Sequence, residues 1–207
     1  MRLLFSLALL AASSTEDVLK ALEESGRTLK SMQARFTETK VLVLLDEQAE
    51  ARGTVLLQVP GRFRWNYDAP QQSVTLVKDG VFARYLPKSR QVFRGKARGE
   101  ADLLVGFGPG AAELGKKYEV ALLGEEALGA SGAYVLDLKP RAAQAGAALF
   151  SSIRLWVDKT RFIPVQTRLT EPTGDHTTVR FEDVQINARL PASAFELALP
   201  RDVVEVK

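Results

Sequence analysis

The chain of 207 residues contains no cysteine and only one histidine, His176. Without cysteine it can form no disulfide bond, hold no metal ion through thiolates and use no cysteine nucleophile. Nor can an acylated N-terminal cysteine anchor it to a membrane. One histidine is too few for a His-rich metal site. We therefore expect neither a metal centre nor a redox-active thiol.

A large excess of charge is also missing. The 28 basic and 25 acidic residues leave a net charge of +3, and the basic residues are scattered along the chain. This is too weak an electrostatic signal for a nucleic-acid-binding protein, which usually gathers Lys and Arg on one face. We expect no nucleic acid partner.

The sequence has no nucleophile elbow, no phosphate-binding loop and no HExxH motif. Carboxylates do occur in pairs, such as Glu125 with Glu126 and Glu182 with Asp183. Adjacent residues of a strand point to opposite faces, so neither pair suits acid–base catalysis. We therefore expect that the protein is not an enzyme.

Long apolar runs are absent, apart from a short one at the start of the chain. Leu3–Leu10, broken only by Ser6, follows Arg2 and precedes the small residues 11–14. The run is too short to span a bilayer and has the order of parts of a secretory signal. We expect a signal peptide at residues 1–14, cleaved near Ser13 or Ser14, and one exported, soluble domain at residues 15–207. A buried N-terminal helix is the alternative.

A helix is expected directly after this segment. Ser14 suits an N-cap, and Glu16 and Asp17 suit a first helical turn. Apolar and small residues then recur at helical spacing, and Gly26 should weaken the helix by about 1 kcal/mol relative to alanine. The stripe consists of Val18, Leu22, Ser25, Leu29 and Met32.

From residue 34 onward the hydrophobic period changes from helical to two, which is typical of strands. The strands are separated by short turns, such as Asp79-Gly80, and not by crossover helices. Short turns predict an antiparallel sheet, and so many strands must curl or split. The candidate strands are 34–44, 52–59, 62–67, 73–78, 81–86, 91–95, 118–123, 133–138, 149–158, 163–170, 177–186 and, less regular, 203–207.

One strand has an unusually aromatic face. After the turn at Pro60-Gly61, residues 62–67 read RFRWNY, which places Phe63, Trp65 and Tyr67 on one side. These aromatic residues are either ordinary core between the sheet and a helix, or the lining of an apolar ligand cavity. Alternation alone leaves both interpretations open.

Residues 99–115 interrupt the strand pattern. Glycines and Pro109 flank one or two short helical turns, and Leu103, Leu104 and Phe107 are too apolar for a free loop. The segment is either a plug that caps the core of the sheet or a movable lid over a cavity.

The order of these features resembles the outer-membrane lipoprotein carrier family, LolA, over nearly the whole chain after the signal. Each matching motif is weak alone, and the order makes the resemblance fairly specific. The matching motifs are Gln33–Phe36, Gly53, Pro60–Trp65 with Tyr67 and Pro70, Val77–Gly80, Tyr85–Pro87 with Gln91-Val92, Leu103-Leu104, Leu155–Asp158 with Ile163-Pro164, Val179–Phe181, Phe195 and Leu199-Pro200.

The resemblance implies a fold that is mainly β with some α: a half-open antiparallel β-barrel of about eleven strands, covered by an N-terminal helix and a short helical lid. It implies an apolar cavity that shields the acyl chains of lipoproteins, with no cofactor. The acyl-binding residues would be Phe36, Leu57, Phe63, Trp65, Tyr67, Tyr85, Leu155 and Val157. The lid residues would be Leu22, Leu29, Leu103, Leu104 and Phe107.

The resemblance further implies a monomer in the periplasm of a Gram-negative envelope. It would take acylated lipoproteins from an inner-membrane lipoprotein-releasing ABC transporter to the outer membrane, and to a lipoprotein receptor there if one is present. The outer-membrane receptor on a related fold is itself acylated at a cysteine, which this chain lacks.

One position departs from the family pattern. Members often carry an arginine just before the proline of the aromatic motif, where it helps to hold the lid closed, and this chain has Val59. Lid closure should therefore differ here. Two further alternatives stay open: a periplasmic binding or sensor protein of the same fold for another lipid or glycolipid, and a periplasmic enzyme.

Overall fold

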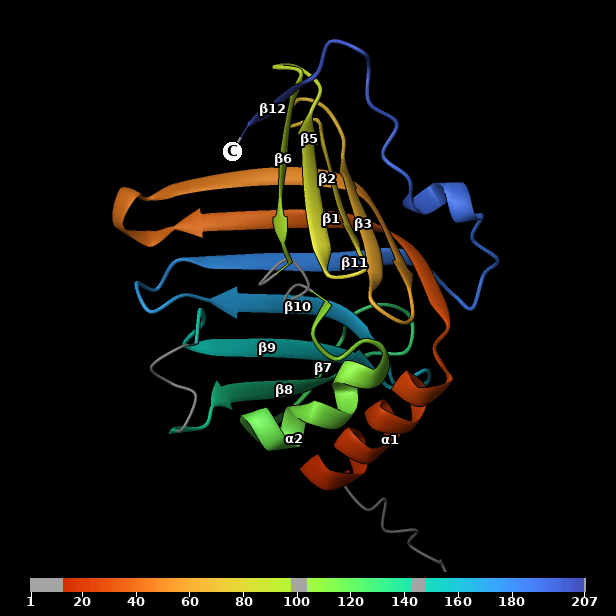
Figure 1. Ribbon diagram of the computed structural model, residues 1–207. Helices are drawn as coiled ribbons and strands as arrows, with labels where there is room; N and C mark the ends of the chain where they lie inside the picture. The colour runs from red at the N-terminus through yellow and green to blue at the C-terminus, as the bar shows by residue number, and fades with distance from the viewer. Residues whose placement is uncertain (1–12, 98–103, 143–147, 207) are drawn as a thin grey trace, which may run out of the picture.

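The computed structural model describes residues 13–97, 104–142 and 148–206. It contains one twelve-stranded sheet with helices at one end of it (Figure 1). The helical elements are α1 (Thr15–Thr28), η1 (Val43–Leu45), η3 (Gly108–Glu113), α2 (Leu114–Lys117) and η4 (Ala192–Phe195). The strands are β1 (Ser31–Leu42), β2 (Glu47–Gln58), β3 (Arg62–Tyr67), β4 (Ser73–Lys78), β5 (Val81–Leu86), β6 (Gln91–Lys96), β7 (Tyr118–Glu126), β8 (Ala133–Pro140), β9 (Ser152–Asp158), β10 (Pro164–Thr170), β11 (His176–Ile186) and β12 (Val204–Val206).

The strand order is β12-β6-β5-β4-β3-β2-β1-β11-β10-β9-β8-β7. All neighbours pair antiparallel except β12 and β6, which pair parallel. The sheet stays open, with β12 and β7 as its two edges. Figure 1 shows β3–β6 turned steeply against β1, β2 and β8–β11, so that one face of the sheet is concave. The expectation of a curled, open antiparallel sheet with few helices is confirmed.

Helix α1 begins where the sequence predicts. The Ser14 side chain accepts a hydrogen bond from the Asp17 backbone amide, and the Asp17 carboxylate accepts one from the Ser14 amide. This reciprocal capping box satisfies two amides that an N-terminal turn would otherwise leave free. The helix ends at Thr28, earlier than the apolar stripe predicted. Met32 instead lies in β1, where it is fully buried.

Gly26 lies on the buried face of α1 and permits a close approach between two backbones. A Cβ at this position would overlap the carbonyl oxygen of Gly108 and lie 3.2 Å from the Cβ of Ala111. The glycine that weakens an isolated helix is therefore the residue that lets η3 pack directly on α1. We call residues 104–117, which include η3 and α2, the covering segment.

The concave face of the sheet carries two hydrophobic clusters. The first lies over β1–β4 and β11, and the second lies over β8–β10 beneath α1 and part of the covering segment. The first contains Leu29, Met32, Ala34, Phe36, Val55, Leu57, Phe63, Trp65, Val77, Leu104, Phe107, Ile163, Val179 and Phe181. The second contains Val18, Leu22, Ala111, Leu114, Tyr134, Leu136, Leu138, Ile153, Leu155, Val157 and Leu169.

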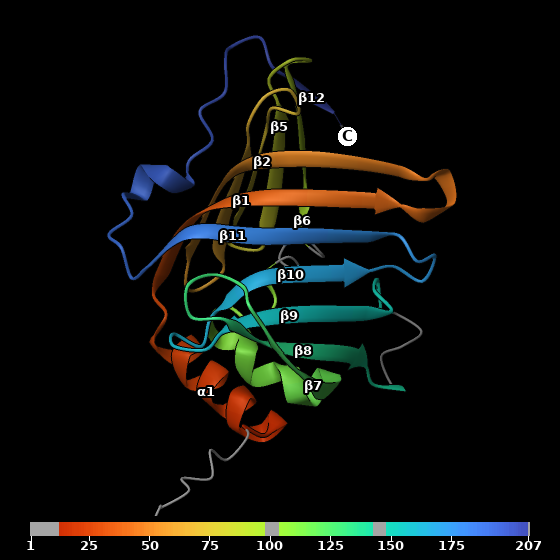
Figure 2. The same ribbon diagram turned by 180° about the vertical axis from the view of Figure 1, so that it is seen from behind.

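The outer face of β3–β6 is covered by the C-terminal segment. The Arg64 guanidinium donates hydrogen bonds to the carbonyl oxygens of Ala194 and Glu196, which fixes η4 against β3. Phe195 is buried there. Figure 2 shows η4 at the outer end of the long strands, on the opposite side from the tip of the β1–β2 hairpin. The concave face is therefore the side of β3–β6 that this segment leaves uncovered.

The turn between β9 and β10 depends on the carboxylate of Asp158. It accepts hydrogen bonds from the backbone amides of Thr160 and Arg161 and from the Ser131 hydroxyl. Burial by itself raises the pKa of Asp158, but these hydrogen bonds outweigh it and hold the pKa below its ordinary value.

Asp158→Asn is expected to cost about 1–3 kcal/mol in the free energy of unfolding at pH 7, because hydrogen bonds to a buried charge are lost. A lowered pKa in the folded state stabilises above the unfolded pKa of about 3.9 and loses this contribution as pH falls through the folded value. The difference between the variant and the wild type, measured by urea unfolding, should therefore shrink between pH 5 and pH 3. An equal difference at both pH values would contradict this role.

Candidate functional site

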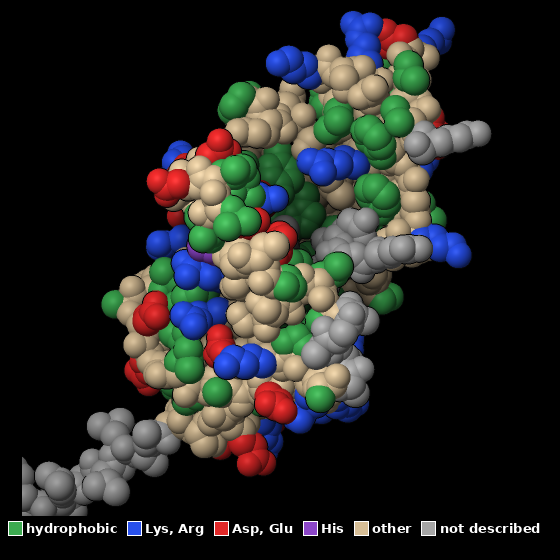
Figure 3. Space-filling view, turned by 90° about the vertical axis from the view of Figure 1, so that its left-hand side faces the viewer, with side chains coloured by type: hydrophobic (Ala, Val, Ile, Leu, Met, Phe, Trp, Pro, Cys, Tyr) green, Lys and Arg blue, Asp and Glu red, His purple; other side chains and the backbone are tan. Residues whose placement is uncertain are grey.

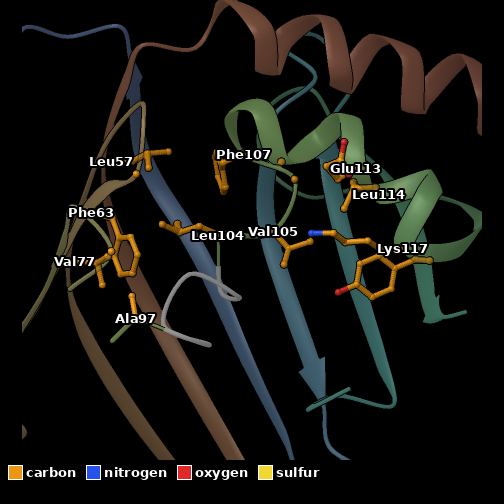
Figure 4. Close-up of a pocket in the computed structure, with 15 residues that line it drawn as sticks. Leu57, Phe63, Val77, Ala97, Leu104, Val105, Phe107, Glu113, Leu114 and Lys117 are labelled. Carbon is orange, nitrogen blue, oxygen red and sulfur yellow. The ribbon is translucent and has the colours of Figure 1, made fainter. Parts of the chain in front are cut away.

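A cavity of about 470 Å³ lies between the sheet and the covering segment. In Figure 4, Phe63 and Val77 of the sheet stand on one side, Leu104 and Phe107 lie in the middle, and Leu114 lies on the other side. The cavity wall is mostly apolar. It is lined by Leu57, Gly61, Phe63, Val77, Gly80, Ala97, Leu104, Val105, Gly106, Phe107, Gly110, Glu113, Leu114, Lys117 and Tyr118.

Two side chains of the covering segment reach into the first hydrophobic cluster. Leu104 and Phe107 are both buried there, and the Phe107 ring meets the Phe181 ring edge-on with centroids 5.3 Å apart. These are two of the predicted lid residues. A third, Leu103, lies outside the described residues.

The covering segment also meets the position that departs from the family pattern. A Cβ on Gly108 would lie 3.3 Å from Cγ2 of Val59, so Val59 packs directly against the backbone of η3. The contact is apolar and carries no charge. At this position, therefore, van der Waals packing replaces the polar latch expected of an arginine.

The other two predicted lid residues come from α1 and its C-terminus. Leu22 is buried in the second cluster with Leu155, whereas Leu29 follows the helix and is buried in the first cluster. Neither residue lines any of the cavities described here. The helix therefore covers the concave face next to the first cavity.

A second cavity, of about 660 Å³, lies on the same concave face further from the helices. It is lined by Trp65, Tyr67, Thr75, Phe82, Arg84, Leu86 and Phe93, all from β3–β6. Figure 3 shows a hollow with hydrophobic side chains at its base in this part of the molecule. Four of the seven lining residues are aromatic, and Arg84 is the only charged one.

A third cavity, of about 490 Å³, shares Tyr67 and Arg84 with the second. The Tyr67 hydroxyl donates a hydrogen bond of 2.7 Å to the Glu38 carboxylate. Burial, and then the charge and hydrogen bond of Glu38, raise the pKa of Tyr67 far above its ordinary value. Tyr67 therefore stays neutral. The other lining residues are Lys40, Ala49, Glu50, Ala51, Gln71, Ser73, Phe150, Leu169, Glu171 and Thr177.

The structure brings five of the eight sequence-predicted acyl-binding residues together. Leu57 and Phe63 line the first cavity, and Trp65 and Tyr67 line the second. Phe36 lines neither cavity but packs behind the second one, with its ring centroid 4.7 Å from that of Trp65 and 5.1 Å from that of Tyr67.

The other three lie elsewhere. Leu155 and Val157 are fully buried in the second cluster and line none of the cavities described here. Tyr85 pairs with Val74 and Val92, on the face opposite to Arg84 and Phe82, so it points away from the concave face. Side chains alternate between the two faces along β5, so once Phe82 lies on the concave face, Tyr85 must lie on the outer face.

Sequence reasoning did not single out several cavity residues. The strands that hold Val77, Phe82 and Phe93 were predicted correctly. The face of the sheet on which these side chains lie depends on how the strands pair, in sequence, with β3. Val77 lies opposite Phe63, so extending the aromatic face of β3 across its neighbour would have identified it. The sequence did not mark Arg84 as a cavity residue, because a single arginine in a strand is ordinarily solvated.

The described residues hold no group of three or more His, Asp or Glu side chains arranged to bind a metal ion. Within those same ranges, no helix is both long and apolar enough to cross a membrane. What the concave face offers is apolar surface with a few polar groups. Such a surface can enclose hydrocarbon.

Known proteins resemble the chain over most of its length. The family model described as outer membrane lipoprotein carrier protein LolA matches residues 27–198. An outer-membrane lipoprotein carrier protein of Bordetella avium is 29% identical over 203 residues, covering 97% of this chain and 90% of the relative. One of Chromobacterium violaceum is 28% identical over 205 residues, covering 95% and 89%.

Solved structures share the fold at lower identity. An uncharacterised conserved protein of Thermus thermophilus superposes with a TM-score of 0.59 at 15% identity, covering 92% of this chain and 97% of its own. MucB of Pseudomonas aeruginosa, in its complex with MucA, superposes with a TM-score of 0.54 at 18% identity, covering 89% and 61%. Together with the family match, these findings place the chain: it belongs to the outer membrane lipoprotein carrier protein LolA family.

Proposed function

We propose that this protein carries the acyl chains of lipoproteins through the aqueous periplasm toward the outer membrane. The single observation that carries the proposal is the concave face of the sheet. It leaves an apolar cavity between Leu57 and Phe63 on one side and the covering segment on the other. The curated relatives named as outer-membrane lipoprotein carrier proteins, which this chain matches over nearly its full length, support the same function.

The energetics explain why such a carrier needs a cavity. An acyl chain with about 15 methylenes gains about 12 kcal/mol on leaving water, at about 0.8 kcal/mol for each methylene. A lipoprotein with several chains therefore needs a shield to cross water. The shield must compete with a membrane of similar apolarity, so its net affinity has to be modest for release to occur.

The covering segment would supply this balance. Leu104 and Phe107 fill part of the concave face at rest, and acyl chains would have to displace them. The apolar surface that these two residues lose on opening offsets part of the gain from cargo burial. The affinity for cargo would then be set by the gain from burying the acyl chains minus the cost of exposing Leu104 and Phe107, with no catalytic step and no cofactor.

The partners follow from the same role. Cargo would be acylated lipoproteins, delivered by an inner-membrane lipoprotein-releasing ABC transporter and handed to an outer-membrane receptor if one is present. An exported monomer would suit this task, and residues 1–14 would serve as the signal peptide. The capping box at Ser14 makes cleavage just before that residue compatible with an intact α1.

The test is to purify the exported protein from the periplasm and to identify what it carries by mass spectrometry. The proposal expects diacylated or triacylated lipoproteins in the preparation, and a purified fluorescent diacylated lipopeptide should bind the delipidated protein. Recovery of a phospholipid or glycolipid alone, with no binding of the lipopeptide, would contradict it and favour a carrier of another lipid.

A further inference from the structure

Two buried polar groups on the concave face have no hydrogen-bond partner among the described residues. They are Nε1 of Trp65, whose side chain lines the second cavity, and Oγ of Ser73, which lines the third. The two residues are only 3% and 2% exposed. Leaving such a group unpaired costs about 1–3 kcal/mol, so native structures rarely tolerate it without a reason.

Arg84 is exposed and lies on the same face of the sheet, with Thr75 between it and Trp65. Along the sheet, Trp65 pairs with Thr75, which pairs with Arg84, and Ser73 pairs with Tyr67 in the next row. Arg84 lines both the second and the third cavity, and within the described residues its guanidinium makes no ion pair or hydrogen bond. Trp65 lines the second cavity, Ser73 lines the third and Arg84 lines both, so three donors without a partner among the described residues border the two adjoining cavities.

The polarity of the concave face changes at this point. Toward the covering segment the walls are Phe63, Val77 and Phe82. On the other side the third cavity is edged by Glu38, Lys40, Glu50, Gln71 and Glu171. An amphipathic acyl lipid needs such a gradient, because its hydrocarbon must leave water while its polar end stays hydrated.

We propose that Trp65, Ser73 and Arg84 form a donor site for the ester carbonyl groups at the head of the acyl chains. The proposal rests on the proposed function and gives the cargo a direction. The tails would run toward Phe63 and the covering segment, and the polypeptide would leave over the third cavity, past Glu38 and the β1–β2 hairpin.

A neutral acceptor fits this site better than an anion. Three carboxylates, Glu38, Glu50 and Glu171, line the third cavity against two cations, Lys40 and Arg84. An anionic group held by Arg84 would face these carboxylates across the cavity, and like charges repel. A carbonyl oxygen accepts the same hydrogen bonds without that repulsion.

The test measures displacement of the apolar dye N-phenyl-1-naphthylamine from the mature protein by dodecane, methyl laurate and laurate. Arg84→Met keeps most of the apolar stem and removes all five donors. We expect it to weaken methyl laurate about tenfold, as loss of a hydrogen bond to a charged donor implies, and to leave dodecane within about twofold. Ser73→Ala should act in the same direction with a smaller effect.

Arg94→Met is the matched control. Arg94 pairs with Ala83 on the outer face and contacts Glu205, so this variant should change none of the three affinities. Equal weakening of dodecane and methyl laurate by Arg84→Met, or no weakening of either, would overturn the donor site alone. Tighter binding of laurate than of methyl laurate would overturn the preference for a neutral group. Failure of all three ligands to displace the dye from the wild-type protein would overturn the proposed function as well.

Discussion

Phe107→Ala is expected to tighten binding of a diacylated lipopeptide by about ten- to a hundredfold. Cargo has to displace Phe107 from its contact with Phe181, and burying a phenylalanine side chain is worth about 1.5–3 kcal/mol. Removing the ring lowers the free energy that opening requires, and each 1.4 kcal/mol corresponds to a factor of ten in the dissociation constant. The measurement is an anisotropy titration with the fluorescent lipopeptide.

Leu138→Ala is the control for general loosening of the fold. Leu138 is fully buried in the second cluster and lines none of the cavities described here. It should destabilise the protein by about 2–5 kcal/mol without tightening the lipopeptide. If Phe107→Ala binds the lipopeptide as weakly as the wild type or more weakly, Phe107 is a permanent part of the core and the displacement mechanism is wrong.

The second large effect concerns the seat of the covering segment on α1. Gly26→Ala is expected to lower the free energy of unfolding by about 2–3 kcal/mol, although alanine favours an isolated helix by about 1 kcal/mol. The added methyl group would overlap the Gly108 carbonyl oxygen, which is backbone and can move only if η3 moves with it. Urea unfolding followed by circular dichroism measures the change.

Gly115 provides a matched glycine in α2. A Cβ there would meet no atom within 4 Å, so Gly115→Ala should be neutral or slightly stabilising. If Gly26→Ala is as neutral or stabilising as Gly115→Ala, the backbones of α1 and η3 do not pack directly against each other at Gly26.

The strands could be predicted from the sequence because each one shows its own alternation. Arg62–Tyr67 and Ser73–Lys78 have the same ends in the sequence and in the structure. The antiparallel pairing followed from the short turns, of which Asp79-Gly80 is the clearest. The parallel pairing of β12 with β6 could not be predicted, because residues 187–203 make no repeating pattern and their path depends on η4.

The cavity residues were harder to predict because facing depends on partners distant in sequence. The alternation of one strand put Phe63 and Trp65 on a common face, and both line cavities, whereas Tyr85 is on the outer face because of its register with β4. Leu155 is an apolar strand residue, as a cavity residue would be. The sequence does not show that α1 and the covering segment bury it. Arg84 is a candidate only because the folded sheet places it on the wall of both cavities, on the same face as the unpartnered groups of Trp65 and Ser73.

If the cover over the concave face is displaceable, a disulfide that holds it closed should prevent cargo from binding. A disulfide needs Cβ atoms about 3.5–4.5 Å apart, and a Cβ at Gly108 would lie 3.3 Å from Cγ2 of Val59, near where a cysteine sulfur at residue 59 would stand. The natural chain has no cysteine, so Val59→Cys with Gly108→Cys forms one defined pair. Each single variant controls for the substitution itself, including the positive φ of Gly108.

The measurement is binding of the fluorescent diacylated lipopeptide to the double variant before and after reduction. We predict that the oxidised protein binds at least about tenfold more weakly and that reduction restores binding, because cargo enters only when η3 lifts away from Val59. Equal binding by the oxidised and the reduced protein would contradict it and would mean that acyl chains enter without moving this cover.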